Sequence, residues 1–284
     1  MKLSIVLSTQ AAQFQAATFQ GDLETNLARV ASLGYQGVEL AIRNPARVDY
    51  PALEGLVKKY GLQVPAIGTG QAWGEEGLSF TDPSPKVRRA AIQRIKSHIP
   101  GAQRFEALII IGLIRGLVRP GVEHARALTW LVEALRECSL AAGECGVRLA
   151  LEPINRYETT LINNCAEGLE LAAQVGAENF GLLLDSFHMN IEEPHIEAAI
   201  AGCAGRLFHF HAADSNRWPP GGGHLDFRSI LGALEKTGYT GWVSGEFLPK
   251  PDAASAAEAA IHYLTGVTVS PSPGGQAPPF SRGR

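Results

Sequence analysis

The chain has 284 residues, of which 45% are hydrophobic and 19% are charged, and its formal net charge at pH 7 is −3. This length suffices for one large core, and the weak negative charge excludes a broad basic surface that would hold a nucleic acid or an anionic membrane. No apolar run reaches the length of a membrane span, and no signal-peptide pattern opens the chain. We therefore expect a soluble metabolic protein of the cytoplasm, whose four cysteines stay reduced because they show no Cys-x-x-Cys spacing.

Short apolar runs without polar alternation recur along the chain, which is typical of strands buried on both faces of a parallel sheet. Helical patterns lie between them. Asp22 predicts the cap of a helix that Gly34 ends, and Asp226 the cap of one that Gly238 ends. The longest helix is predicted at 122–146. The eight predicted strands cover residues 2–7, 37–42, 63–68, 107–113, 147–152, 181–185, 207–212 and 242–247.

Strands that alternate with helices predict an all-parallel sheet, and eight such units favour closure into a barrel. The expected fold is therefore α/β, a single (β/α)8 TIM barrel that forms the catalytic domain at residues 1–266. The turn after the first predicted strand has no Gly-x-Gly-x-x-Gly motif, which argues against a dinucleotide-binding fold. Residues 267–284 are rich in proline and glycine, and we predict a disordered tail there.

Four residues of metal-ligand type stand at the carboxyl ends of the last four predicted strands: Glu152, Asp185, His211 and Glu246. Taken singly, each has an ordinary structural explanation, as an ion-pair partner, a helix cap, a core histidine or a loop carboxylate. Together they converge on the face where barrel enzymes build their active sites. Buried like charges are costly unless a cation neutralises them, so the set predicts a divalent-metal site. Three carboxylates and an imidazole favour Mn²⁺, Mg²⁺ or Co²⁺ over a structural zinc.

Further polar residues follow these strands on loops at the same end of the barrel. Glu158, His188 and Arg217 could contact hydroxyl and carbonyl oxygens of a substrate there. Arg115 follows the fourth predicted strand, and its guanidinium could pair with a substrate carboxylate in bidentate fashion. A solvated loop arginine is the competing interpretation. His209 shares strand parity with one predicted ligand, so we expect it one layer lower in the barrel, in a structural role.

The motifs that carry these residues resemble those of ketose 3-epimerases of the tagatose 3-epimerase type, within the xylose isomerase-like TIM barrels. The resemblance extends over nearly the whole chain, up to about Leu264, and rests on segments 152–158, 185–189, 209–217 and 245–246. A narrower resemblance, to the 5-keto-L-gluconate epimerase branch, rests on segments 1–9, 19–23, 67–72 and 188–193.

The resemblance implies a metal-dependent isomerase that inverts the carbon next to the ketone of a small keto-sugar. Glu152 and Glu246 would be the acid/base pair on opposite faces of the substrate, acting through a metal-stabilised enediolate. One ion, Mn²⁺ before Mg²⁺ or Co²⁺, would be held by these two glutamates with Asp185 and His211. Of the residues on the neighbouring loops, two would contact the carbonyl end of the substrate and one would orient a hydroxyl or stabilise a histidine; these are His188, Arg217 and Glu158. A homo-oligomer, dimeric or tetrameric, is also expected.

The branch resemblance and Arg115 favour a keto-sugar acid of the 5-keto-L-gluconate or D-tagaturonate type. Several alternatives stay open: a neutral ketose such as tagatose or psicose, an aldose–ketose isomerase such as one acting on hydroxypyruvate, and a sugar phosphate held by the backbone of Gly221-Gly222-Gly223. A DNA-repair endonuclease on the same barrel would need further ligands after the third and fourth strands, which offer none. A sugar-binding module has little use for two opposed glutamates on a metal.

Overall fold

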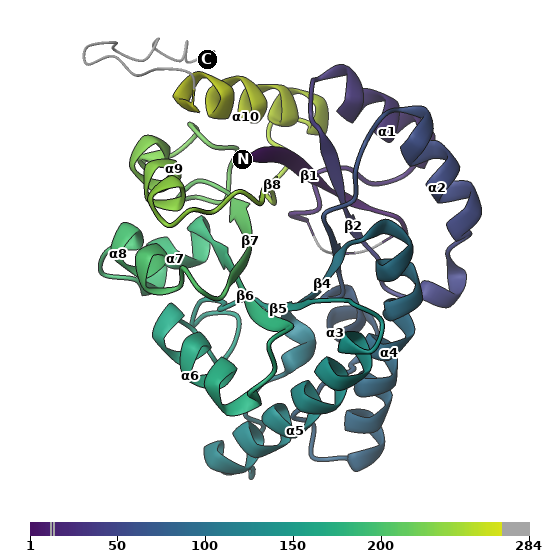
Figure 1. Cartoon of the computed structure of the whole chain (residues 1–284), viewed down its shortest axis with the longest axis vertical. Helices are drawn as coiled ribbons and strands as arrows, with labels where there is room; N and C mark the ends of the chain where they lie inside the picture. The colour runs from purple at the N-terminus through teal and green to yellow at the C-terminus, as the bar shows by residue number, and fades with distance from the viewer. Residues whose placement is uncertain (12, 14, 269–284) are drawn as a thin grey trace.

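The structure, a computed structural model, describes residues 1–11, 13 and 15–268. Eight parallel strands form a closed barrel in which each strand pairs with its neighbours in chain order, and β8 closes the ring against β1 (Figure 1). This confirms the predicted (β/α)8 TIM barrel. The strands are β1 (Lys2–Ser8), β2 (Gly37–Ala41), β3 (Ala66–Gly68), β4 (Leu108–Ile111), β5 (Leu149–Leu151), β6 (Phe180–Asp185), β7 (Leu207–Ala212) and β8 (Trp242–Gly245).

Helices surround the barrel on its outside (Figure 1). The α-helices are α1 (Leu23–Ser32), α2 (Tyr50–Lys59), α3 (Gln71–Glu76), α4 (Pro85–Phe105), α5 (His124–Gly143), α6 (Cys165–Val175), α7 (Ser186–Glu192), α8 (Ile196–Gly202), α9 (Phe227–Lys236) and α10 (Ala253–Thr268), and two short 3₁₀ helices are η1 (Pro45–Arg47) and η2 (Leu113–Arg115).

The helix caps at Asp22 and Asp226 are confirmed, because the carboxylate of Asp22 accepts one backbone N–H of the first turn of its helix and that of Asp226 accepts two. The prediction that the longest helix lies at 122–146 is wrong. α5 has 20 residues, whereas α4 has 21 and continues past Pro100. The buried side chains of α4 extend as far as Ala102, so packing against the barrel holds the helix together beyond the proline.

The interior of the barrel changes from apolar to polar along its axis. Side chains of β3 to β6 form an apolar cluster inside the ring, made of Ala66, Leu108, Ile110, Ala150 and Leu183. Residues two positions further along a strand point to the same face. Glu152 therefore follows Ala150 into the interior, and Asp185 follows Leu183. The polar site rests on this apolar layer, which closes it from below.

No helix in the described part of the chain is long and apolar enough to cross a membrane. The predicted disordered tail lies almost wholly at residues 269–284, outside the described residues, while α10 continues to Thr268. The tail therefore stays a prediction.

Candidate active site

Strands β5 to β8 bring the four predicted metal ligands to one end of the barrel. Asp185 is the last residue of β6 and pairs in register with His211 of β7. Glu152 directly follows β5, and Glu246 directly follows β8. Asp185 also caps α7, since its Oδ1 accepts the N–H of Phe187 at 2.8 Å, and this contact turns Oδ2 toward the barrel axis.

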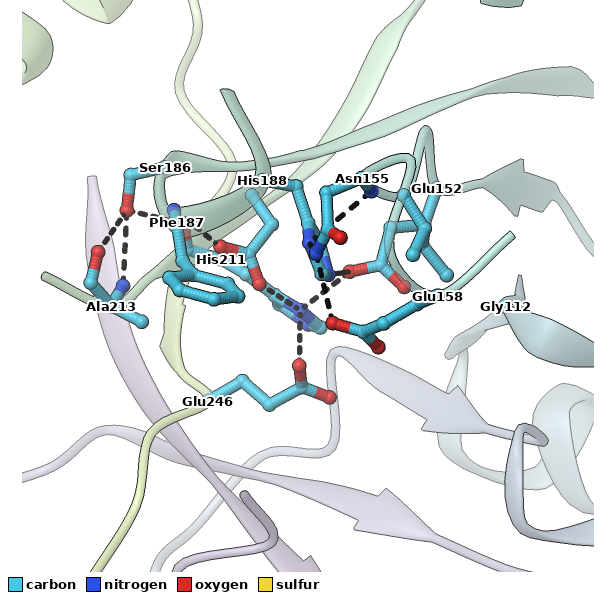
Figure 2. Close-up of polar contacts among 12 residues, drawn as sticks. Gly112, Glu152, Asn155, Glu158, Ser186, Phe187, His188, His211, Ala213 and Glu246 are labelled. Atoms are coloured by element: carbon cyan, nitrogen blue, oxygen red, sulfur yellow. Dashed lines mark hydrogen bonds and ion pairs between the residues drawn. The ribbon is translucent and has the colours of Figure 1, made fainter. Parts of the chain in front are cut away.

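The ligand atoms of these residues gather around Nδ1 of His211. Glu152 Oε1, Asp185 Oδ2 and Glu246 Oε2 each lie 3.7 Å from it. Figure 2 shows the side chains of Glu152, His211 and Glu246 converging on this point, and the ligand atoms of all four residues lie within 4.8 Å of one another. Among the described residues, Glu152 Oε1, Asp185 Oδ2 and His211 Nδ1 have no hydrogen-bond partner although they are buried.

This arrangement fits a divalent cation. Three carboxylates surround one imidazole in a site where each residue is at most 9% exposed. The surrounding carboxylates raise the pKa of His211 well above its ordinary value although burial acts to lower it, so the site attracts positive charge. Buried acceptor atoms that converge without partners are satisfied when they coordinate a cation. The donor set of three carboxylates and one nitrogen suits a hard or borderline ion.

A fourth buried carboxylate, Glu39 of β2, contacts His211 on the side of the ring away from the cluster. Its Oε2 lies 3.0 Å from Nε2 of His211 and 2.9 Å from Nε2 of His209. Because a carboxylate only accepts, the ring of His211 carries a proton on Nε2, which leaves Nδ1 to face the cluster. His209 is buried beside His211, and its ring hydrogen-bonds to Glu39, which is compatible with the predicted structural role.

The predicted substrate-binding residues Glu158, His188 and Arg217 line the same cavity as three members of the cluster, Glu152, His211 and Glu246. Nη2 of Arg217 donates to Glu246 Oε2 at 2.7 Å, and Nη1 lies 3.6 Å from Glu158 Oε1. Nε2 of His188 lies 3.7 Å from Glu152 Oε1. Burial and the charge of Arg217 keep the pKa of His188 well below its ordinary value, so the imidazole is neutral near pH 7.

Arg217 has a left-handed backbone with φ of 59°, which is rare for a side chain of its size. Its N–H donates to the carbonyl of Asp214, and its own carbonyl accepts the N–H of Leu248. Its guanidinium lies over the ring of Phe187, 4.8 Å from the centroid. The loop thus holds a strained residue whose side chain reaches Glu246.

The two glutamates have different electrostatic surroundings. Burial, and then the negative charge of Glu246, raise the pKa of Glu152 to about 7 in spite of His211. Burial also acts to raise the pKa of Glu246, but the charges of His211 and Arg217 outweigh it and lower that pKa. Such a difference between two neighbouring carboxyl groups is common in sites that transfer protons.

Comparison with known proteins decides the family. Residues 27–265 match the family of xylose isomerase-like TIM barrels. The chain belongs to this family. An L-ribulose 3-epimerase of Mesorhizobium japonicum is 32% identical over 236 residues, which cover 82% of this chain and 78% of that protein. A D-psicose 3-epimerase of Enterocloster bolteae is 29% identical over 228 residues, covering 78% of this chain and 75% of that enzyme. A solved structure of D-psicose 3-epimerase with D-tagatose from Clostridium cellulolyticum superposes with a TM-score of 0.80 at 25% identity, covering 94% of this chain and 99% of that one.

These relatives identify the chain as an isomerase of the sugar epimerase class. The structure contradicts the predicted role of one site residue, Arg115. Arg115 ends η2 and is fully buried, and it does not reach the cavity that holds the cluster. Its guanidinium donates to the backbone carbonyls of Gly112, Leu161, Ile162 and Glu152. These contacts leave it no path to a substrate carboxylate, so Arg115 supports the loops of the barrel mouth instead.

The loop at Gly221-Gly222-Gly223 is not arranged as a phosphate-binding nest. The buried carboxylate of Asp214 accepts N–H groups from Ser215, Gly221 and Leu225. A Cβ atom on Gly223 would lie 2.2 Å from Asp214 Oδ1, so the loop is closely wrapped around this side chain. The loop therefore binds a carboxylate of the protein itself. The alternative prediction of a phosphate nest at Gly221-Gly222-Gly223 is wrong.

Two residues of this site were missed by sequence reasoning. Glu39 lies in the middle of a fully buried strand, where a carboxylate without partners would destabilise the fold. This position was the sequence signal for a role of Glu39 in the site. Asn155 is 1% exposed and donates to Glu158 at 2.8 Å. Its place between Glu152 and Glu158 in the sequence was the only indication of a role.

Proposed function

We propose that this protein is a ketose 3-epimerase that acts on a neutral ketose and inverts the carbon next to the ketone. The observation that carries the proposal is the pair Glu152 and Glu246, which face one buried point from the ends of β5 and β8, with two strands between them. Proton removal from one face of a carbon and return to the other face require two such groups. The names of the relatives, L-ribulose 3-epimerase and D-psicose 3-epimerase, support the same reaction.

The four clustered residues would hold one divalent ion, with Mn²⁺ as our first choice and Mg²⁺ or Co²⁺ as alternatives. When bound, such an ion supplies Lewis acidity, which lowers the energy of negative charge on substrate oxygens. Glu152 and Glu246 each turn one oxygen toward the cluster. The other oxygen of Glu152, Oε2, lies on the side of Gly112, where an added Cβ would be 3.6 Å away. Gly112 lines the cavity, so this oxygen is placed to exchange a proton with a substrate.

The remaining polar residues would hold the sugar between the two glutamates. Arg217 positions Glu246 through its 2.7 Å hydrogen bond, and His188 faces Glu152. Glu158 lies close enough to Arg217 to share its charge and offers acceptor oxygens to a substrate hydroxyl. The cavity, of about 220 Å³, is closed below by the apolar layer of the barrel, which limits access of water to the reacting carbon.

A neutral substrate suits the charges of the cavity better than a keto acid. The described lining residues include five glutamates, Glu39, Glu75, Glu152, Glu158 and Glu246, but a single guanidinium, that of Arg217. That guanidinium is already paired with Glu246. Since Arg115 is buried elsewhere, a substrate carboxylate would enter an acidic cavity without a cationic side chain reserved for it. The neutral ketose thus replaces the keto-sugar acid as the favoured substrate.

Turnover of a substrate panel tests this proposal. We would incubate the purified protein with Mn²⁺, Mg²⁺ or Co²⁺ in D₂O, supply L-ribulose, D-psicose, D-fructose, D-tagatose and 5-keto-L-gluconate separately, and follow products by NMR. We expect epimers of at least one neutral ketose, with deuterium at the inverted carbon. Faster turnover of 5-keto-L-gluconate would contradict the substrate class, and epimerisation without deuterium would contradict the two-glutamate route.

A further inference from the structure

The side chain of Asn155 lies between two residues that face the cavity (Figure 2). Its Nδ2 donates to Glu158 Oε1 at 2.8 Å and lies 2.8 Å from Nδ1 of His188. Its Oδ1 accepts the backbone N–H of Tyr157 at 3.0 Å. Because a backbone N–H only donates, the oxygen of the amide must be at that end. The amide therefore has one permitted orientation, with its NH₂ group toward His188 and Glu158.

This orientation determines where the proton of His188 lies. An NH₂ group only donates, so Nδ1 of His188 must accept and carries no proton. The backbone N–H of Asn155 lies 3.5 Å from the same nitrogen and is a second donor that favours an unprotonated Nδ1. The opposite tautomer would place two N–H groups against each other at 2.8 Å. The contact between Arg217 Nη1 and Nε2 is longer, 3.4 Å, and too weak to reverse this preference.

We propose that Asn155 is a positioning residue, which holds His188 as the Nε2–H tautomer so that the ring presents a hydrogen-bond donor to a substrate oxygen. The inference rests on the proposed epimerase function. Nε2 lies 3.7 Å from Glu152 Oε1, on the side of the ring that faces the reacting groups. A donor there stabilises the negative charge that develops on the ketone oxygen when the neighbouring carbon loses its proton. A lone pair at the same place would oppose that charge.

The same amide also determines the hydrogen-bonding role of Glu158. One hydrogen of Nδ2 goes to His188 and the other to Glu158, so the carboxylate is held as an acceptor. Asn155 is 1% exposed, which leaves little room for water to replace these contacts. One side chain thus gives the site a donor for the ketone oxygen and, beside it, an acceptor for a hydroxyl group.

The tautomer can be measured directly. We would label the histidine rings of the Mg²⁺-loaded protein with ¹⁵N, because Mg²⁺ is diamagnetic, and assign His188 by comparison with His188→Gln. Proton–nitrogen correlation spectra distinguish a protonated from an unprotonated ring nitrogen. We expect a proton on Nε2 in the wild type. In Asn155→Asp the carboxylate accepts instead of donating, so the proton should move to Nδ1, with a loss in kcat on the order of 10²-fold and little change in KM.

Asn163→Ala is the matched control, because Asn163 lies on the same loop and donates to the carbonyls of Ile154 and Thr159 without touching His188. It should leave the tautomer and kcat unchanged. Asn155→Ala serves if Asn155→Asp does not fold, and its two tautomers should then be mixed. A proton on Nδ1 in the wild type, or Nε2–H alone in both Asn155 variants, overturns the proposal. Since the spectra need no turnover, a failure of the proposed function would appear separately, as inactivity on every ketose.

Discussion

Glu39 lies directly behind His211, with its Oε2 3.0 Å from Nε2 of the imidazole. The opposite ring nitrogen, Nδ1, faces the three carboxylates of the candidate metal site. The pair therefore has the arrangement in which an outer carboxylate fixes the tautomer and direction of a metal-binding histidine. The two histidines hold the pKa of Glu39 below its ordinary value against the effect of burial, so it stays ionised.

We predict that Glu39→Gln weakens binding of a divalent ion by ~10–100-fold, the usual effect of losing such an outer partner. The amide removes the negative charge that favours Nε2–H on His211. Competition with a chelator of known affinity measures the dissociation constant. Glu75→Gln is the control, because Glu75 lines the same cavity but bonds to the N–H of Gln13 rather than to a histidine. An unchanged dissociation constant in Glu39→Gln would remove Glu39 from the site.

Glu152→Gln and Glu246→Gln should each lower kcat by at least ~10²-fold, since each removes one positioned acid or base. Both variants keep an oxygen that could bind a metal, so loss of metal must be separated from loss of proton transfer. Asp185→Asn separates them, because Asp185 belongs to the candidate metal cluster but not to the proposed acid/base pair. At saturating metal, Asp185→Asn should recover much of its activity and the two glutamine variants should not. Equal recovery in all three would limit the glutamates to metal binding.

The clustering of the four predicted metal ligands could be predicted from sequence, because position at the carboxyl end of a barrel strand is enough to bring side chains together. Register and parity then placed Asp185 beside His211 without any knowledge of loops. Arg115 shows where this reasoning ends. The sequence places it after β4, but the turn of η2 directs its long side chain inward, toward carbonyls that only the folded loops bring together. Glu39 was missed because it lies within a strand, one layer below the mouth.

Arg115→Met should destabilise the fold instead of altering substrate preference. The substitution removes hydrogen bonds to backbone carbonyls in a fully buried site and leaves those carbonyls without donors, at a cost of ~2–4 kcal/mol. Urea unfolding of the metal-free protein measures the loss. The exposed Arg119→Met is the control and should change the free energy of unfolding by less than ~0.5 kcal/mol. A selective loss of activity on 5-keto-L-gluconate, with stability unchanged, would instead return Arg115 to the substrate site.

A buried histidine outside the active site should make stability depend on pH. His98 of α4 is fully buried, and neither ring nitrogen has a hydrogen-bond partner among the described residues. Burial, and then the charge of Arg94, lower its pKa from 6.5 to about 3. Below pH 6.5 the unfolded chain therefore binds a proton that the folded protein does not, and the free energy of unfolding falls as the pH drops toward 3.

We predict that His98→Leu makes this fall shallower by up to ~1.4 kcal/mol per pH unit, because one titrating group is removed from the unfolded state only. Carboxylates with lowered pKa values, such as Glu76, give both proteins a slope of the same sign, so the difference between the two slopes is the informative quantity. Urea unfolding at several pH values between 4 and 6 measures it. His124→Leu, at an exposed position at the start of α5, should keep the wild-type slope. If His98→Leu keeps that slope too, His98 is protonated in the folded protein and has a partner that its surroundings do not reveal.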